Sequence, residues 1–251
     1  MHEWPLSSVQ RITFQSGQRV AYKAQLPPTV EPEFYQRAQS SLLPDYRIIG
    51  EVENCTTMAI GWIEHPSLQS CNLDVDMLVS HGRQVLSHIS RLDEDLPVHL
   101  NVGTSSKWIS AVEKVAKWAE LLNADGRFPT ARFWRLSAVY HWARSSAVMN
   151  SIDRSRLIHG DLKAEQIFIV DGGYKVIDWQ RPMFVPSEID LVSILVTERQ
   201  DPRFYVDVTT VRLFWFLRLY WAMEAQADLF PDYRGDLFER WTAQSIKRIL
   251  E

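Results

Sequence analysis

Hydrophobic and polar residues alternate along the first part of the chain with the period of β-strands. Two such runs, RITF and RVAYKAQL, lie on either side of QSGQ and predict a β-hairpin. Pro32 then suits the first turn of a helix, and EFYQRAQSSLL continues with helical spacing. A further strand-like run, MAIGWIE, covers residues 58–64. The pattern therefore predicts a small β-rich region at the start of the chain.

Beyond His65 and Pro66 the hydrophobic period becomes mainly helical, so we predict two domains, residues 1–65 and residues 66–251. The expected helices are residues 75–92, 107–122, 131–150, 192–196, 211–227 and 237–250. Six tryptophans fall within these apolar patterns, where packing is the default role. They are Trp108, Trp118, Trp134, Trp142, Trp215 and Trp221.

The stretch LIHGDLKAEQIFIVDGGYKVIDWQRP, residues 157–182, interrupts the helical pattern with two short apolar strands, QIFIV and YKVI. A DG dipeptide between apolar runs predicts a tight hairpin. Asp161 and Asp178 each follow a short apolar strand. Such a hairpin returns the chain, so we expect both carboxylates at one edge.

Two carboxylates in this setting are typical of phosphoryl transfer. A hydroxyl that attacks the γ-phosphoryl group of ATP needs a carboxylate to orient it and take its proton, and Mg²⁺ to neutralise the phosphate oxygens. Mg²⁺ in proteins is held by one or two carboxylates, with phosphates and water completing its shell. Asp161 fits the first role and Asp178 the second.

HGD, a polar residue five positions on, and a strand ending in IDW resemble the aminoglycoside phosphotransferase and choline kinase family, small-molecule relatives of the protein kinases. The resemblance implies an α+β, protein-kinase-like two-lobed fold. Its N-terminal lobe is reduced and β-rich, and its larger C-terminal lobe is mainly helical and carries the catalytic and substrate-binding residues. The resemblance also implies ATP, Mg²⁺ and a small-molecule acceptor.

The resemblance assigns roles to single residues. Asp161 stands where the family has its catalytic base, and His159 braces that loop. Lys163 stands where protein kinases carry a lysine that meets the transferred phosphate. Asp178 binds metal. The second metal ligand of the family is asparagine, and this chain has Gln166, whose amide oxygen lies one methylene further out.

In the same family a strand lysine pairs with ATP phosphates and with a glutamate of the following helix. Lys23 matches the lysine, with Glu33 as the expected partner and Glu31 as the alternative. Glu64 ends a run that resembles the strand leading into the kinase hinge, where backbone groups meet adenine. No GxGxxG precedes the first hairpin, so either residues 6–9 form a serine-containing phosphate loop or the first strand is lost.

Composition narrows the functional classes. The 251 residues are 46% hydrophobic, and 27 basic against 31 acidic residues give a net charge of −4, which provides no electrostatic case for nucleic acid. Cys55 and Cys71 have neither metal spacing nor the density of a disulfide scaffold, which favours a reducing cytoplasm. No signal peptide is visible, and the most apolar segment, residues 213–217, is too short to span a membrane.

The sequence therefore predicts an ATP- and Mg²⁺-dependent phosphotransferase that acts on a hydroxyl of an amino sugar, amino alcohol or sugar. The alternative is a non-catalytic, kinase-like module that binds nucleotide or another protein. Gln166 and the missing glycine loop motivate that alternative. The residues do not specify the acceptor or the oligomeric state.

Overall fold

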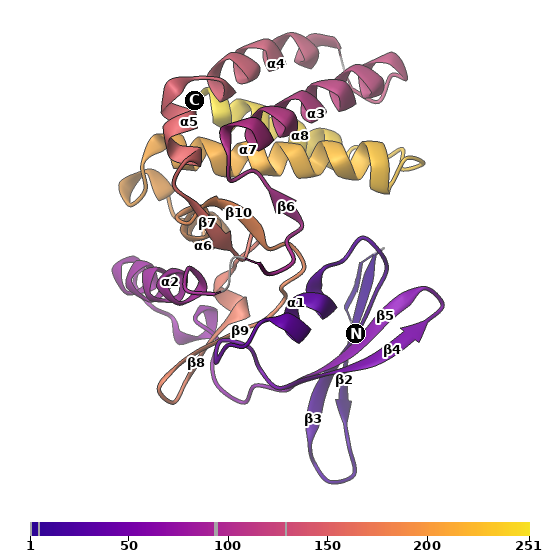
Figure 1. Ribbon diagram of the computed structural model, residues 1–251, viewed down its shortest axis with the longest axis vertical. Coiled ribbons are helices and arrows are strands. Elements are labelled where there is room, and N and C mark those ends of the chain that lie inside the picture. Colours follow the sequence, from indigo (N-terminus) through magenta and orange to yellow (C-terminus); the bar gives the residue numbers. More distant parts are fainter. Residues whose placement is uncertain (1, 5, 93–94, 129) are drawn as a thin grey trace. The chain divides into compact units, whose positions relative to one another are not determined.

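A computed structural model of the chain describes residues 2–4, 6–92, 95–128 and 130–251, with the side chains of residues 2–4 and 130–134 left aside (Figure 1). Packing divides the chain into two compact units. Unit 1 comprises Met1–Leu100, Leu157–Met183 and Ser193–Gln200. Unit 2 comprises Asn101–Arg156, Phe184–Val192 and Asp201–Glu251.

Unit 1 contains a five-stranded antiparallel sheet in the order β1-β2-β3-β5-β4. Its strands are β1 His2–Trp4, β2 Ser7–Thr13, β3 Arg19–Gln25, β4 Tyr46–Val52 and β5 Cys55–Gly61. The predicted hairpin of β2 and β3 is confirmed. Neither alternative for the missing glycine loop is correct, because a strand precedes β2 and residues 7–9 already pair within the sheet. Alternation is hard to recognise in a strand as short as β1, which explains why sequence reasoning missed it.

Helix α1, Glu31–Arg37, follows β3 and begins close to the predicted point, with Pro32 in its first turn. The helical spacing predicted from the sequence continues for several residues beyond Arg37, where the helix ends. The helix ends because Ala38 adopts an extended backbone and the Ser40 hydroxyl accepts a hydrogen bond from the Leu42 amide. Serine side chains compete in this way with helical hydrogen bonds.

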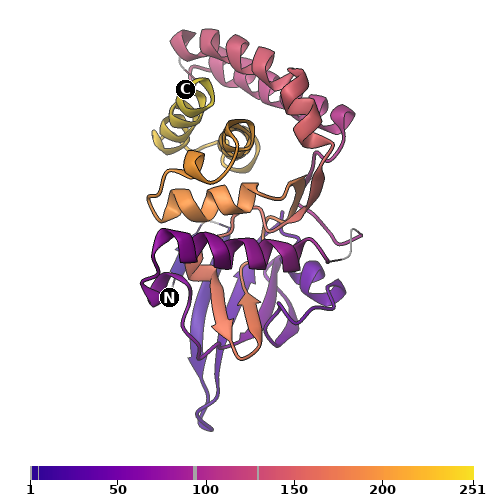
Figure 2. The same cartoon turned by 90° about the vertical axis from the view of Figure 1, so that its left-hand side faces the viewer.

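The predicted second hairpin is also present in unit 1, as β8 Ile167–Val170 and β9 Gly173–Val176. Gly172 in its turn has a φ of +84°, which glycine adopts without strain. The hairpin lies beside α2, Val75–Ile89, and the Tyr174 hydroxyl is 2.7 Å from His81 Nδ1 (Figure 2). Unit 1 also contains two short 3₁₀ turns, Gln69–Cys71 and Ala164–Gln166.

The predicted lobe boundary at His65 and Pro66 falls inside unit 1, in a stretch without helix or strand after β5. The units are defined by packing rather than by role, so the predicted division into a nucleotide-binding lobe and a catalytic lobe stays a prediction. The chain passes between the units at five points, and four of these points lie within a strand or helix. These elements are β6 Leu100–Asn101, β7 Ser155–Ile158, β10 Met183–Pro186 and α6 Ile189–Thr197.

Unit 2 is built from helices. They are α3 Ser105–Ala124, α4 Thr130–Ala143, α5 Ser146–Ile152, the 3₁₀ turn Pro202–Phe204, α7 Val208–Glu224, the π-helical turn Ala225–Leu229 and α8 Leu237–Leu250. Helices α7 and α8 pack side by side (Figure 1). The single helix predicted for residues 131–150 is in fact two helices, because Ser145 caps a new helix by accepting a hydrogen bond from the Val148 amide.

Aromatic side chains fill the interior of unit 2. Trp108 is fully buried on Phe216, with ring centroids 4.7 Å apart, and its indole N–H donates to the Ala143 carbonyl at 2.8 Å. Trp118 and Trp215 are buried as well. Trp142 and Trp221 are half-buried, and the side chain of Trp134 lies outside the described residues. Among the described residues, no helix combines the length and the apolar character needed to cross a membrane.

Candidate functional site

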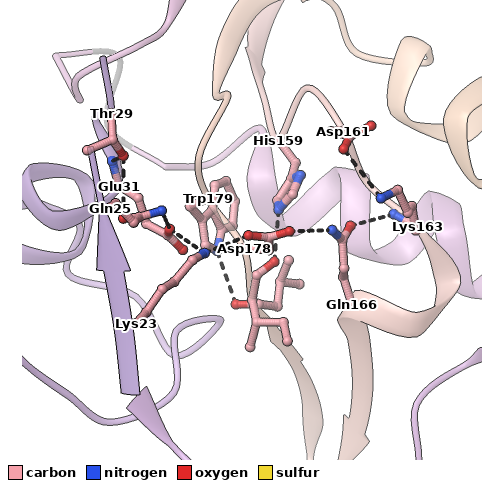
Figure 3. Close-up of polar contacts among 12 residues, drawn as sticks. Lys23, Gln25, Thr29, Glu31, His159, Asp161, Lys163, Gln166, Asp178 and Trp179 are labelled. Carbon is pink, nitrogen blue, oxygen red and sulfur yellow. Dashed lines mark hydrogen bonds and ion pairs between the residues drawn. The ribbon is translucent and has the colours of Figure 1, made fainter. Parts of the chain in front are cut away.

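A buried ion-pair network lies in unit 1 around Lys23 (Figure 3). Strand β3 points the Lys23 ammonium into the interior, where it lies 2.5 Å from a Glu31 carboxylate oxygen and 2.6 Å from Asp178 Oδ1. Lys23 is 4% exposed and Glu31 is fully buried. Gln25, on the same face of β3, donates a hydrogen bond to the Glu31 oxygen at 2.7 Å. Residues far apart in the chain therefore meet at one ammonium group.

The prediction that Glu33 is the partner of Lys23 is wrong. Its carboxylate pairs with Arg37 one helical turn further on, at 3.1 Å, and both side chains are about half exposed. Glu31 takes the role, as the alternative prediction had it. Two residues along an α-helix correspond to a rotation of about 200°, so only one of the two glutamates can face β3.

Mutual attraction controls the protonation of this network. Burial by itself lowers the pKa of Lys23, but the Glu31 and Asp178 carboxylates outweigh it and raise that pKa. Burial has the opposite effect on Asp178 and raises its pKa, but the Lys23 ammonium outweighs burial and lowers that pKa to about 2. Burial raises the pKa of Glu31, which Lys23 only partly offsets. Near neutral pH the site therefore holds a charged Lys23 and an ionised Asp178.

Trp179 fixes the position of Asp178. Its ring is fully buried, stacks on Phe34 of α1 with centroids 4.5 Å apart, and its indole N–H donates to the Val176 carbonyl at 3.0 Å. Asp178 itself has a φ of +73°, in the left-handed region that non-glycine residues rarely adopt. Strained backbone of this kind is concentrated at functional sites. Sequence reasoning used the tryptophan as part of a motif but gave it no role.

His159 lies against the same segment. It is fully buried, and its Nε2 donates to the Ile177 carbonyl at 3.0 Å, so this nitrogen carries the proton. Burial lowers the pKa of His159, which keeps the imidazole neutral near pH 7. Its ring centroid lies 4.7 Å from that of Trp179. A neutral, buried donor to a backbone carbonyl has the geometry of a brace, which is the predicted role.

The glycine of HGD also has a physical reason. Gly160 has a φ of +87°, and a Cβ at this position would lie 1.9 Å from the Arg181 carbonyl oxygen. Only glycine allows the chain to pass this close, and it turns the backbone just before Asp161. Sequence reasoning used this glycine only as a motif letter.

Asp161 and Lys163 lie on the loop that follows. The Lys163 ammonium is 3.5 Å from Asp161 Oδ2, and each side chain is about one third exposed. Both groups thus remain accessible to solvent, unlike Lys23 and Glu31. The loop offers a carboxylate and an ammonium to a bound molecule.

Gln166 connects this loop to Asp178. Its amide oxygen accepts a hydrogen bond from the Lys163 backbone N–H at 2.8 Å, and its amide nitrogen donates to Asp178 Oδ2 at 3.0 Å (Figure 3). The residue is 4% exposed. The contacts therefore run without a break from Glu31 through Lys23, Asp178, Gln166 and Lys163 to Asp161.

The donor set fits Mg²⁺ only in part. Asp178 offers an ionised carboxylate, which suits a site completed by phosphate and water. Gln166, the predicted second ligand, turns its N–H groups rather than its oxygen toward Asp178. Within the residues that the structure describes, no three His, Cys, Asp or Glu side chains are grouped as a metal centre. The role of Asp178 as a metal ligand stays a prediction.

Glu64 lies after β5, in the segment predicted to meet adenine. Its carboxylate pairs with Arg19 of β3, and the Arg19 guanidinium lies 5.8 Å from the ring centroid of Trp62. The Trp62 amide donates to the Arg19 carbonyl at 3.2 Å, which ties this segment to the sheet. The contact with adenine stays a prediction.

No protein-family model matches the sequence, and no curated protein matches it either. Solved structures do match. A thermostable mutant of an aminoglycoside phosphotransferase superposes with a TM-score of 0.67 at 15% identity, over 99% of this chain and 91% of the other. A choline/ethanolamine kinase family protein from Mesorhizobium loti gives 0.63 at 10% identity, over 97% and 87%.

Spectinomycin phosphotransferase in complex with ADP and spectinomycin gives a TM-score of 0.55 at 15% identity, over 98% of this chain and 85% of the other. The chain has the fold of these phosphotransferases. The predicted kinase-like α+β fold, with a small β-rich part and a larger helical part, is therefore confirmed. At these identities the likeness concerns the fold, and the activity has to be argued from the site.

Proposed function

We propose that the protein is an ATP- and Mg²⁺-dependent phosphotransferase that transfers the γ-phosphoryl group to a hydroxyl of a small molecule. The observation that carries this proposal is the continuous set of contacts from Glu31 to Asp161. A buried ion pair is weak evidence for stability, because desolvation offsets much of its Coulomb energy. Because stability does not explain such a network, we take it as evidence of function.

The network contains groups that suit both the phosphates of a nucleotide and a metal ion bound to them. Lys23 offers a cation to phosphate oxygens, and Asp178 offers an ionised carboxylate to a metal ion. Lys23 is held rigidly between two carboxylates at 2.5 and 2.6 Å, so its ammonium is positioned before a nucleotide arrives. We assign Lys23 to the ATP phosphates and Asp178 to the metal ion. When bound, Mg²⁺ would neutralise phosphate oxygens during transfer.

Asp161 is the group we assign as catalytic base. Its carboxylate is accessible, lies on a loop that Gly160 and His159 fix, and has a cation, Lys163, within 3.5 Å. Asp161 would orient the attacking hydroxyl and take its proton. Lys163 would meet the negative charge of the group in transfer. Residues 1–65 then form the nucleotide-binding lobe, with Glu64 near the base of the nucleotide, and residues 66–251 the catalytic lobe.

The neighbours in fold support a proposal for the acceptor class. One of them is a spectinomycin phosphotransferase bound to ADP and spectinomycin, and another is a choline/ethanolamine kinase family protein. We therefore propose an amino sugar, an amino alcohol or a sugar as the acceptor, together with ATP.

The test is an assay of ADP release from ATP with the purified protein, over a panel of amino sugars, amino alcohols and sugars, with Mg²⁺ and with EDTA. We expect acceptor-dependent ADP release that EDTA abolishes. A matched reaction without acceptor measures hydrolysis by water. If no acceptor raises ADP release above that background, the proposal of transfer to a small molecule is wrong.

One observation favours a second candidate, a kinase-like module that binds nucleotide without turnover. Gln166 does not offer its oxygen to a metal ion beside Asp178. A thermal shift with ATP separates the two. Stabilisation by ATP without ADP release on any acceptor supports the module, and release on one acceptor excludes it.

A further inference from the structure

The amide of Gln166 has an orientation that its neighbours determine. A backbone N–H can only donate a hydrogen bond, and an ionised carboxylate can only accept one. The Lys163 N–H therefore requires the amide oxygen, and Asp178 requires the amide N–H₂. Turning the amide over would place two donors against each other and two oxygens about 3 Å apart, so both contacts would be lost together.

The length of the side chain fits this task. The amide reaches back three residues to Lys163 and across to Asp178, twelve residues further on. Backbone contacts reinforce the same geometry, because the Gln166 N–H donates to the Lys163 carbonyl at 3.0 Å and the Ile177 N–H donates to the Gln166 carbonyl at 3.2 Å.

A cation beside Asp178 would meet the positive end of this amide. Using the oxygen of Gln166 as a ligand would require the side chain to turn and would leave the Lys163 N–H without this acceptor. Asp178 needs no such rearrangement. Its side chain is about one third exposed.

We propose that Gln166 is a positioning residue that holds Asp178 against the loop of Asp161 and Lys163, and that its amide oxygen stays on the Lys163 N–H, and is not a metal ligand, when a divalent cation binds beside Asp178. The first part stands on the hydrogen bonds of Gln166 to Lys163 and Asp178. The second part rests on the proposed function. The role differs from that of a ligand, because Gln166 acts through Asp178 and Lys163 rather than on the metal ion.

The first part is tested by thermal unfolding in EDTA without nucleotide. Gln166→Leu keeps the volume but removes both hydrogen bonds, and we expect the melting temperature to fall by about 2–8 °C. Glu165→Leu, at the exposed neighbour in the same turn, is the matched control and should leave the melting temperature within about 1 °C. A residue that serves only as a metal ligand does not stabilise the protein in EDTA, so its replacement would leave the melting temperature unchanged. A Gln166→Leu protein as stable as the wild type in EDTA would therefore overturn the bracing role.

Gln166→Glu is a second variant that tests the same bracing role. It keeps the acceptor for the Lys163 N–H and replaces the donor to Asp178 by a carboxylate oxygen. We expect a lower melting temperature in EDTA and a larger gain on adding Mn²⁺ than in the wild type, since a cation relieves the repulsion of two carboxylates. Equal melting temperatures of this variant and the wild type in EDTA would contradict the proposal.

The second part is tested by a crystal structure with Mn²⁺ and ADP, in which anomalous scattering locates the metal. We expect Mn²⁺ on an Asp178 oxygen and the phosphates, with the Gln166 oxygen still on the Lys163 N–H. A Gln166 oxygen within about 2.2 Å of Mn²⁺ would overturn it. If the wild type binds neither Mn²⁺ nor ADP in solution, the proposed function and this part fail together, while the EDTA measurements still decide the bracing role.

Discussion

The charged centre of unit 1 and the aromatic interior of unit 2 differ in the free energy of burying their side chains. In unit 1, the ionisable side chains of Lys23 and Glu31 are almost completely buried. In unit 2, Trp108 and Phe216 are fully buried, and the one polar atom of the tryptophan donates to a carbonyl at 2.8 Å. Burying aromatic rings stabilises a fold directly, whereas burying charges costs free energy unless each is paired.

The contrast separates a region that packing explains from one that packing does not explain. A network such as Lys23, Glu31 and Asp178 is often replaced by apolar residues without loss of stability. Its presence in unit 1 is the reason for placing the proposed nucleotide site there. The aromatic contacts of unit 2 need no such explanation, because packing accounts for them.

Removing the ammonium from the centre of unit 1 should have the largest effect on stability. Lys23→Met keeps a chain of similar length but leaves the Glu31 and Asp178 carboxylates facing each other, and breaking a buried pair from one side costs about 3–5 kcal/mol. Urea unfolding in EDTA measures this loss. Lys114→Met in unit 2 is the control, since its ammonium is half exposed and 3.9 Å from Glu224. That variant should lose less than about 1 kcal/mol, and equal losses would remove the distinction between the two regions.

A change within the aromatic interior of unit 2 should have a smaller effect, confined to stability. Trp108→Phe deletes the hydrogen bond to the Ala143 carbonyl and part of a buried ring, at a cost of about 1–3 kcal/mol. We expect the rise in melting temperature on adding ADP to stay as in the wild type. A variant that kept its stability but lost the response to ADP would show that this interior serves binding as well as packing.

Acid should weaken unit 1 through Asp178. Its pKa is about 2 in the folded protein, below the value of about 3.9 in an unfolded chain. A lowered pKa contributes stability that is complete above the unfolded value and is lost as the pH falls through the folded value. Urea midpoints in EDTA should therefore differ by a constant amount between wild type and Asp178→Asn above about pH 5, and converge between about pH 4 and pH 2. A difference that stays constant down to pH 2 would contradict the assigned pKa.

Much of the fold was predictable because local patterns determine it. The hairpin of β2 and β3, the hairpin around Asp171 and Gly172 and the helices of unit 2 all carry strong periodicity or turn signals. The break at Ser145 was not predicted, because apolar spacing continues across it and only the serine indicates a cap. Strand β1 was missed because three residues show too little alternation.

The candidate site was predictable in its residue types but not in its contacts. Asp161 and Asp178 stand out because the HGD and IDW motifs carry them. The choice of Glu31 over Glu33 depends on where α1 begins, and a shift of two residues reverses the face that a side chain occupies. The direction of the Gln166 amide depends on a carboxylate twelve residues away, which no local pattern encodes.

The measurement that tests the account most directly compares the turnover of Asp161→Asn with that of Asp171→Asn, an exposed aspartate in the turn between β8 and β9. Both variants remove one carboxylate from the same stretch of chain. We expect Asp161→Asn to lower kcat by about 10²–10⁴-fold while ADP affinity stays within about twofold, because proton transfer by a positioned base contributes a factor of this size. Asp171→Asn should keep the wild-type rate. Wild-type phosphoryl transfer by Asp161→Asn would contradict the proposed role of Asp161.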